Sequence, residues 1–212
     1  MYKDLFDIFY EMRHNMYYFA GYLTKFILSL FGRLKIHQKG NLPESGGYVI
    51  ACTHTGWVDI LRLGHSILPL KIHYMAKIEL FQNRPLKWLM EQLNAFPVNR
   101  ENPGPSAIKT PRKLIKEGKI VGIFPSGTRT SEDAPLKRGA VTIIGNSKAP
   151  IVPAAYVGPN NFKDLLKFQK PHIIFGEPIY AREDVPRREA SDIMMEELND
   201  ALKLLQDEIR SK

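Results

Sequence analysis

The residues best suited to chemistry are His54 and Asp59, which lie five positions apart directly after the apolar run 48–52. That run predicts a buried strand, and Gly56 permits a turn beyond its end. A carboxylate that folds back onto an imidazole selects the tautomer whose other nitrogen accepts a proton. The spacing therefore predicts a general base with an orienting partner, and Trp57 between them offers an apolar wall. The alternative interpretation is a local hydrogen bond in a turn that takes no part in catalysis.

Two arginines suit the binding of an anion, because Arg100 and Arg129 each follow a short apolar run that predicts a strand. A guanidinium group offers planar, paired donors to a phosphate, so the two arginines together predict a phosphate clamp. Gly127 permits close approach of the backbone, and Thr128 offers a hydroxyl and an N–H group. Lys137 would enlarge the basic pocket. Taken singly, each of these residues is more often part of an exposed surface.

Other catalytic templates fail in this sequence. It contains no GxGxxG, no Walker loop and no HExxH motif, so we predict no metal site and no nucleotide cofactor. Cys52 lies within an apolar run, where a lone cysteine belongs to the core more often than to a catalytic site. Ser126 lacks the first glycine of a GxSxG elbow, which argues against a serine hydrolase.

Strands and helices alternate through most of the chain. We expect strands at 34–38, 48–52, 72–76, 95–98, 119–124, 151–156 and 172–175, and helices at 60–67, 85–93, 107–117, 140–146 and through 194–209. This alternation predicts an α/β fold with a mostly parallel or mixed central sheet flanked by helices. In such sheets the functional groups gather beyond the carboxyl ends of the strands, where the histidine and the two arginines fall.

The N-terminal segment 1–34 differs in composition from the rest, because it holds almost half of the chain's aromatic residues. Apolar residues recur there at helical spacing and predict two amphipathic helices, 3–19 and 21–32, with a break at Gly21. No uncharged run reaches the roughly 20 residues that a spanning helix needs. Aromatic residues beside lysine and arginine suit a membrane interface, and a hairpin packed on the core is the alternative. We therefore predict a membrane-interfacial segment followed by a catalytic domain at 35–212.

The formal net charge of +8 favours anionic partners such as phosphate esters, anionic lipid surfaces or an acidic carrier protein. Basic surface that serves solubility alone is the other explanation. Nucleic acid is disfavoured, because the basic residues are scattered and no recognition motif is present. The single cysteine excludes an intrachain disulfide and fits a reducing compartment, and the first residues lack the pattern of a secretory signal.

Four short blocks of sequence occur in order between residues 53 and 153. They are His54-xxxx-Asp59, Phe96-Pro97-Val98-Asn99-Arg100, Phe124-Pro125-Ser126-Gly127-Thr128-Arg129 and Val152-Pro153. Together they resemble the motif blocks of the glycerolipid acyltransferases, in particular the bacterial 1-acylglycerol-3-phosphate (lysophosphatidic acid) acyltransferase group. The chain departs from that pattern at two positions, because Ser126 stands where glutamate is usual and Gly56 where serine is common.

The resemblance implies a single-step acyl transfer with no cofactor beyond the co-substrate. An acyl thioester, on acyl carrier protein or coenzyme A, would donate to the sn-2 hydroxyl of 1-acylglycerol 3-phosphate and give phosphatidic acid. His54 would be the general base and Asp59 its orienting partner. Arg100 and Arg129 would hold the acceptor phosphate in a pocket shaped by the residues that precede Arg129.

The resemblance also implies that Val152 and Pro153 line the acyl region, and that the protein acts at the cytoplasmic face of the cell membrane as a peripheral or monotopic protein. Ser126 leaves the acceptor open, because serine removes a charge and much of the reach of glutamate. Two alternatives follow: an acyltransferase for a different lysolipid or phosphate-bearing acceptor, and a non-catalytic protein that binds anionic lipid.

Overall fold

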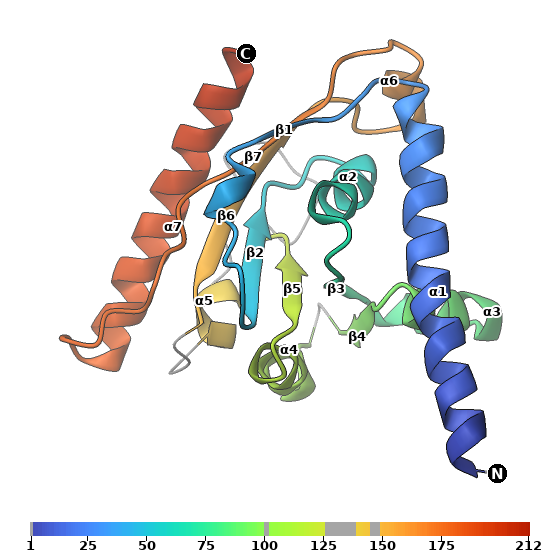
Figure 1. The fold of residues 1–212 in the computed structure, drawn as a ribbon. Coiled ribbons are helices and arrows are strands. Elements are labelled where there is room, and N and C mark those ends of the chain that lie inside the picture. Colours follow the sequence, from blue (N-terminus) through green and yellow to red (C-terminus); the bar gives the residue numbers. More distant parts are fainter. Residues whose placement is uncertain (1, 100–101, 126–138, 145–148) are drawn as a thin grey trace.

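The structure is a computed structural model that describes residues 2–99, 102–125, 139–144 and 149–212. Only the backbone is described for residues 2–15. Figure 1 shows a central sheet with helices on both faces. The strands are β1 (Lys35–His37), β2 (Tyr48–Cys52), β3 (Ile72–Lys77), β4 (Phe96–Val98), β5 (Ile120–Ile123), β6 (Ile151–Val157) and β7 (His172–Phe175). The helices are α1 (Tyr2–Ser29), α2 (Val58–Ile67), α3 (Arg84–Gln92), α4 (Ser106–Lys116), α5 (Gly139–Ile144), α6 (Phe162–Leu165) and α7 (Arg187–Arg210), with short 3₁₀ turns η1 (Lys39–Asn41) and η2 (Ile78–Phe81).

The described strands form one sheet in the order β1-β7-β6-β2-β5-β3-β4. Neighbours pair in parallel, except that β6 and β7 are antiparallel. This arrangement confirms the predicted α/β fold with a mostly parallel, mixed sheet. Because β2, β3, β4, β5 and β6 run in one direction, their carboxyl ends meet at one edge of the sheet.

Strand β2 lies at the centre of the fold, and every residue in it is buried. Val49 and Ala51 face a core cluster shared with α4, α5 and α7, whereas Ile50 and Cys52 face a second cluster shared with α2. Burial on both faces explains why the strand reads as a continuous apolar run rather than an alternating one. Because β2 is packed on both faces, the turn that follows it begins from a fixed position.

Helix α1 is continuous from Tyr2 to Ser29, so the prediction of two helices with a break at Gly21 was wrong. A glycine inside a helix costs only about 1 kcal/mol relative to alanine, which packing can offset. A Cβ at Gly21 would meet the Leu68 side chain at 3.6 Å, an ordinary contact distance, so this part of α1 lies against the end of α2. Helix α1 packs on α2 and α3, outside the layer that covers the sheet (Figure 1).

Candidate active site

The turn between β2 and α2 holds the predicted pair together. Asp59 lies in the first turn of α2, and His54 follows the end of β2 by two residues. The Nδ1 atom of His54 is 3.2 Å from each carboxylate oxygen of Asp59. Both side chains are buried, with His54 only 7% exposed and Asp59 fully buried. The geometry therefore matches an imidazole that is oriented by a carboxylate.

Backbone donors fix the carboxylate of Asp59. The N–H groups of Thr55 and Gly56 donate to its Oδ2 atom at 2.6 Å and 2.9 Å. A carboxylate held in this way accepts a hydrogen bond from Nδ1–H of His54, which leaves Nε2 of the same ring as a proton acceptor. A negative charge in the first turn of α2 is also favoured by the helix dipole.

The segment after β6 supports the turn from the other side. The Thr55 hydroxyl is 2.7 Å from Oδ1 of Asn160 and 3.4 Å from Oδ2 of Asp59, so its single proton goes to the shorter bond with Asn160. The backbone carbonyl of Asn160 also lies against Gly56, where an added Cβ would be only 2.0 Å from the oxygen. Position 56 therefore needs glycine because of this close approach.

Aromatic rings cover the histidine. The Phe124 ring, just after β5, lies with its centroid 4.4 Å from that of His54, and Tyr74 of β3 stacks beyond Phe124 at 6.1 Å. The Tyr74 hydroxyl donates to the carbonyl of Ile60 in α2 at 2.8 Å. These contacts hold the imidazole against an apolar wall. They also link β3 to α2 and to the residue that follows β5.

A cavity of about 940 Å³ opens beside His54. Trp57 and Phe124 line it near the histidine, and the rest of its described lining comes from α1, α2, β3, η2, α3 and the residues directly after α2 and α3. The cavity reaches Gly21 of α1 and Leu68 at the end of α2, so it runs along the whole length of α2. Its lining is mainly apolar and suits a long apolar ligand group.

A buried histidine lies in the wall of this cavity, away from His54. The Nε2 atom of His65 is 2.9 Å from the hydroxyl of Thr24, and that hydroxyl donates to the carbonyl of Ala20 at 2.7 Å. Nε2 must therefore be the donor in the contact with Thr24. Burial, with smaller effects from Arg62 and Lys25, lowers the pKa of His65 to about 4, so its ring is neutral at physiological pH.

Arg62 links α2 to the end of α1. Its side chain is 1% exposed, and its Nη2 atom donates to the carbonyls of Leu28 and Gly32 at 2.8 Å and 2.9 Å. Carbonyl groups at a helix C-terminus lack partners within the helix and carry partial negative charge, so they suit a buried cation. Arg62 thereby fixes the helix that forms one wall of the cavity.

The predicted site residues fall into three groups. His54, Asp59 and Trp57 come together at the cavity, with Trp57 36% exposed. Val152 and Pro153 are buried within β6, and neither is among the described residues that line the cavity. The predictions for Arg100, Ser126, Gly127, Thr128, Arg129 and Lys137 lie outside the described residues.

The described residues of the blocks that contain Arg100 and Arg129 extend past the carboxyl ends of β4 and β5. Asn99 follows β4 and Pro125 follows β5. Strand β4 is parallel to β3, β3 is parallel to β5, and β5 is parallel to β2.

Cys52 is fully buried, and burial, together with the charge of Asp59, raises the pKa of its thiol well above the usual range. The thiol stays protonated, which agrees with its interpretation as a core residue.

The sequence interpretation missed several residues of the site, chiefly Arg62, His65 and Asn160. A signal for the first two was present, because both lie on the predicted helix after Asp59 at intervals of three residues, among apolar neighbours. Asn160 gave no such signal, because it meets the turn only through the sheet. Within the described ranges, no group of three or more His, Cys, Asp and Glu side chains could hold a metal ion.

Residues 33–157 match the model of a family described as Acyltransferase. The chain is 56% identical to a 1-acyl-sn-glycerol-3-phosphate acyltransferase from Bacillus subtilis over 92% of this chain and 98% of that protein. It is 34% identical to a protein of the same name from Streptococcus pneumoniae, over 76% of this chain and 61% of that protein. The fold resembles the crystal structure of the 1-acyl-sn-glycerophosphate (LPA) acyltransferase PlsC from Thermotoga maritima, with a TM-score of 0.60 at 17% identity over 92% of this chain and 79% of that one.

Proposed function

The chain belongs to the acyltransferase family, and we propose that it transfers a fatty acyl group from an acyl thioester to the sn-2 hydroxyl of 1-acylglycerol 3-phosphate. The product of this reaction is phosphatidic acid. The names of the relatives from Bacillus subtilis and Streptococcus pneumoniae support the acceptor. The observation that carries the proposal is the His54–Asp59 pair at the edge of a long apolar cavity.

The proposed reaction takes place in one chemical step at His54. The Nε2 atom takes the proton of the acceptor hydroxyl while the oxygen attacks the carbonyl carbon of the thioester. The new C–O bond forms, the C–S bond breaks, and the thiolate leaves with the proton that His54 carried. Asp59 holds the ring in the tautomer that accepts this proton and stabilises the imidazolium that forms. A thiolate is a good leaving group, so no covalent acyl-enzyme is required.

The cavity supports the binding of the acyl chain. It begins beside His54 and Trp57 and extends between α1 and α2, so an acyl chain within it would present its thioester carbonyl to the histidine. Holding the two reacting groups in one site supplies much of the acceleration expected for such a transfer. Either acyl carrier protein or coenzyme A fits this arrangement, because the chain enters the cavity while the carrier stays outside.

The sequence blocks that contain Arg100 and Arg129 are the candidates for binding the acceptor phosphate. We propose that these two arginines hold the phosphate, with Gly127, Thr128 and Lys137 completing the pocket. Support comes from Phe124, the first residue of the block that contains Arg129, because its ring packs on His54. A clamp that follows β4 and β5 would lie at the edge of the sheet that carries the base.

The segment 1–34 is proposed to hold the catalytic domain, 35–212, at a membrane surface on the cytoplasmic side. None of the described helices is long and apolar enough to span a bilayer. One face of α1 is exposed and apolar, and Leu30 continues it directly after the helix. Its residues recur at helical spacing: Phe19, Tyr22, Leu23, Phe26, Ile27 and Leu30. The opposite face packs on the protein through Tyr17 and Leu28, so the exposed face suits the interface of a bilayer.

The test combines substitutions at the pair with lysophosphatidic acid and an acyl thioester as substrates. We expect His54→Ala and Asp59→Asn each to lower kcat by about 10²–10⁴-fold, since a positioned base contributes that much. The matched controls are His37→Ala on the edge strand β1 and Asp207→Asn on the exposed side of α7, which should keep wild-type turnover. Near-normal turnover by a folded His54→Ala variant would refute the mechanism.

Product identification separates the remaining alternatives. Incubation with a panel of lysolipids and with both donor types shows which acceptor and which thioester the enzyme prefers. A preference for another lysolipid would implicate Ser126, which stands where the family usually has glutamate. Vesicle binding without thioester consumption, unchanged by substitution of His54 or Asp59, would instead identify a non-catalytic lipid-binding protein.

A further inference from the structure

The segment that follows β6 presents an apolar surface to solvent. In the α6 loop, which we define as residues 160–170, Phe162 is 62% exposed, Leu166 is 53% exposed and Phe168 is 64% exposed. Between them, Leu165 is buried in a cluster with Leu28 of α1 and Val58 of α2. The loop is therefore anchored by one apolar residue and directs its larger ones outward.

The backbone of this loop is strained where it exposes an aromatic ring. Phe168 has φ at +48°, in the left-handed region that a bulky residue rarely adopts. Such a conformation costs free energy, and asparagine or glycine would adopt it more easily. The phenylalanine nevertheless occupies this position, where its ring stacks on Phe31 at a centroid distance of 6.0 Å. Strain that keeps an apolar ring in contact with solvent points to a role for that ring in binding.

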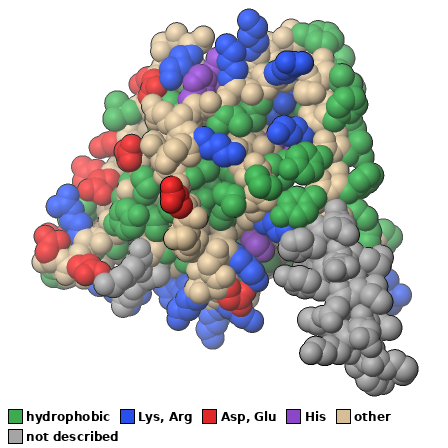
Figure 2. Space-filling view, in the orientation of Figure 1, with side chains coloured by type: hydrophobic (Ala, Val, Ile, Leu, Met, Phe, Trp, Pro, Cys, Tyr) green, Lys and Arg blue, Asp and Glu red, His purple; other side chains and the backbone are tan. Residues whose placement is uncertain are grey.

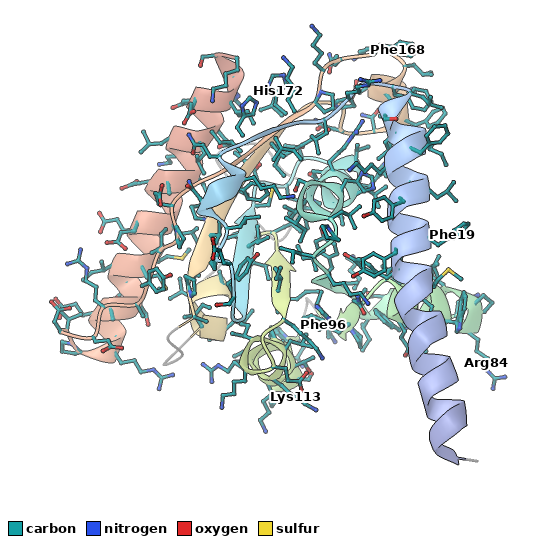
Figure 3. All side chains as sticks on the ribbon, in the orientation of Figure 1. Phe19, Arg84, Phe96, Lys113, Phe168 and His172 are labelled. Atoms are coloured by element: carbon teal, nitrogen blue, oxygen red, sulfur yellow. The ribbon has the colours of Figure 1, made fainter. Side chains whose placement is uncertain are left out.

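The loop continues the exposed face of α1. Figure 3 shows Phe19 and Phe168 on the side of the molecule away from α7, with Phe168 beside the C-terminal end of α1. Figure 2 shows hydrophobic side chains along the same edge, where the second half of α1 and the α6 loop lie. Gly32, three residues after the end of α1, permits this contact, because an added Cβ would be 2.5 Å from the backbone oxygen of Gln169.

Charge around this surface favours an anionic partner. The loop carries three exposed lysines and one acidic residue, Asp164, whose Oδ1 atom already accepts from Lys167 at 2.7 Å. The neighbouring part of α1 and the residues after it add Lys25 and Arg33, both exposed, and the stretch 16–35 has no acidic residue. Aromatic side chains flanked by lysine and arginine are the composition that binds the interface of an anionic bilayer.

We propose that the α6 loop is a second membrane-contacting element, which inserts Phe162, Leu166 and Phe168 into the interface of an anionic lipid bilayer beside α1. The proposal rests on the proposed function, since a membrane-resident acceptor gives the contact its purpose. The loop also begins at Asn160, whose side chain and carbonyl support the turn that carries His54. One short segment therefore both supports the catalytic turn and seats the protein on the lipid that supplies the acceptor.

The first experiment measures vesicle binding of full-length variants by co-sedimentation with phosphatidylglycerol–phosphatidylcholine vesicles. We expect Phe162→Ser combined with Phe168→Asn to lower the partition coefficient by about tenfold or more, because each inserted ring contributes through its buried apolar area. Asparagine accepts the left-handed conformation, so the variant should fold at least as well at that position. The matched control is Leu204→Gln, because Leu204 is 69% exposed on α7, on the other side of the molecule (Figure 1).

The second experiment relies on the burial of Cys52, the chain's single cysteine, which should leave it unlabelled. Phe168→Cys and Leu204→Cys each then carry one environment-sensitive fluorophore. We expect anionic vesicles to shift the emission of the label at position 168 to shorter wavelength and to leave the label at 204 unchanged. Phosphatidylcholine vesicles alone should give a smaller shift at 168.

The outcomes separate this inference from the proposed function. Wild-type vesicle binding by the double variant, or equal emission at positions 168 and 204, overturns the membrane role of the loop whether or not the enzyme transfers acyl groups. With substrates in detergent micelles, the double variant should keep the wild-type kcat. A selective rise in KM for acyl carrier protein thioesters, with unchanged vesicle binding, would assign the loop to an acidic carrier protein and refute our proposal.

Discussion

The close approach at Gly56 allows a direct test of the turn that carries His54. In Gly56→Ala the new Cβ would lie 2.0 Å from the carbonyl oxygen of Asn160, whereas ordinary contact begins near 3.4 Å. The obstacle is backbone rather than a flexible side chain, so either the turn or the segment after β6 must move by about 1 Å, a displacement that can cost about 10²-fold in rate. The overpacking itself should destabilise the fold by about 1–3 kcal/mol, which lowers Tm by several degrees.

The assay compares both kcat/KM, with lysophosphatidic acid and an acyl thioester, and Tm for Gly56→Ala and Gly40→Ala. Gly40 is the matched control, because it is exposed in η1 and an added Cβ there would have no atom within 4 Å. Alanine at position 40 should keep the wild-type kcat/KM and change Tm little. Wild-type kcat/KM and Tm in Gly56→Ala would show that the turn does not depend on this contact.

Three further predictions concern α1 and the cavity. Gly21→Leu should exclude about two methylene groups of an acyl chain, which costs about 1.6 kcal/mol, so kcat/KM should fall about tenfold for long-chain thioesters and stay unchanged for short ones; equal losses at every chain length would contradict the assignment. Arg62→Met should lower the free energy of unfolding by about 3 kcal/mol in chemical denaturation, because the carbonyls of Leu28 and Gly32 lose a charged donor, whereas the exposed control Arg188→Met should change it little. The folded pKa of His65, about 4, lies below the unfolded value of 6.5, so the unfolded chain binds the extra proton first and stability falls as pH drops through this window. Between about pH 7.5 and about pH 5 the wild type should therefore lose about 2 kcal/mol more than His65→Gln, and equal losses would contradict the pKa assigned here.

Local patterns were enough to predict most elements of the fold. The run at 48–52 was continuous and apolar because β2 is covered on both faces, and the structure has the same bounds for that strand. The pairing of His54 with Asp59 was predictable for a similar reason, because both residues lie in one turn whose ends are fixed by a strand and a helix. Interactions between near neighbours in the chain are those that spacing alone can specify.

The remaining parts of the site depend on contacts between distant segments. Asn160 meets the turn because β6 pairs with β2, and no spacing in the sequence reveals that approach. Local propensity predicts a helix break at Gly21, because it carries no information on the Leu68 side chain that lies against this glycine. The cavity follows from the same kind of packing, because α1 and α2 must meet before a space between them exists.

Helix α2 connects the parts of this site, because residues at intervals of three along it act on different neighbours. Asp59 bonds to the His54 ring, Arg62 donates to carbonyls at the end of α1, and His65 bonds to Thr24 in the cavity wall. Movement of α2 along its axis would therefore change the position of the imidazole and the shape of the cavity together. This coupling means that Arg62→Met should alter acyl-chain preference as well as stability. An Arg62→Met variant that loses stability but keeps the wild-type chain-length profile would show that the cavity wall is held by other contacts.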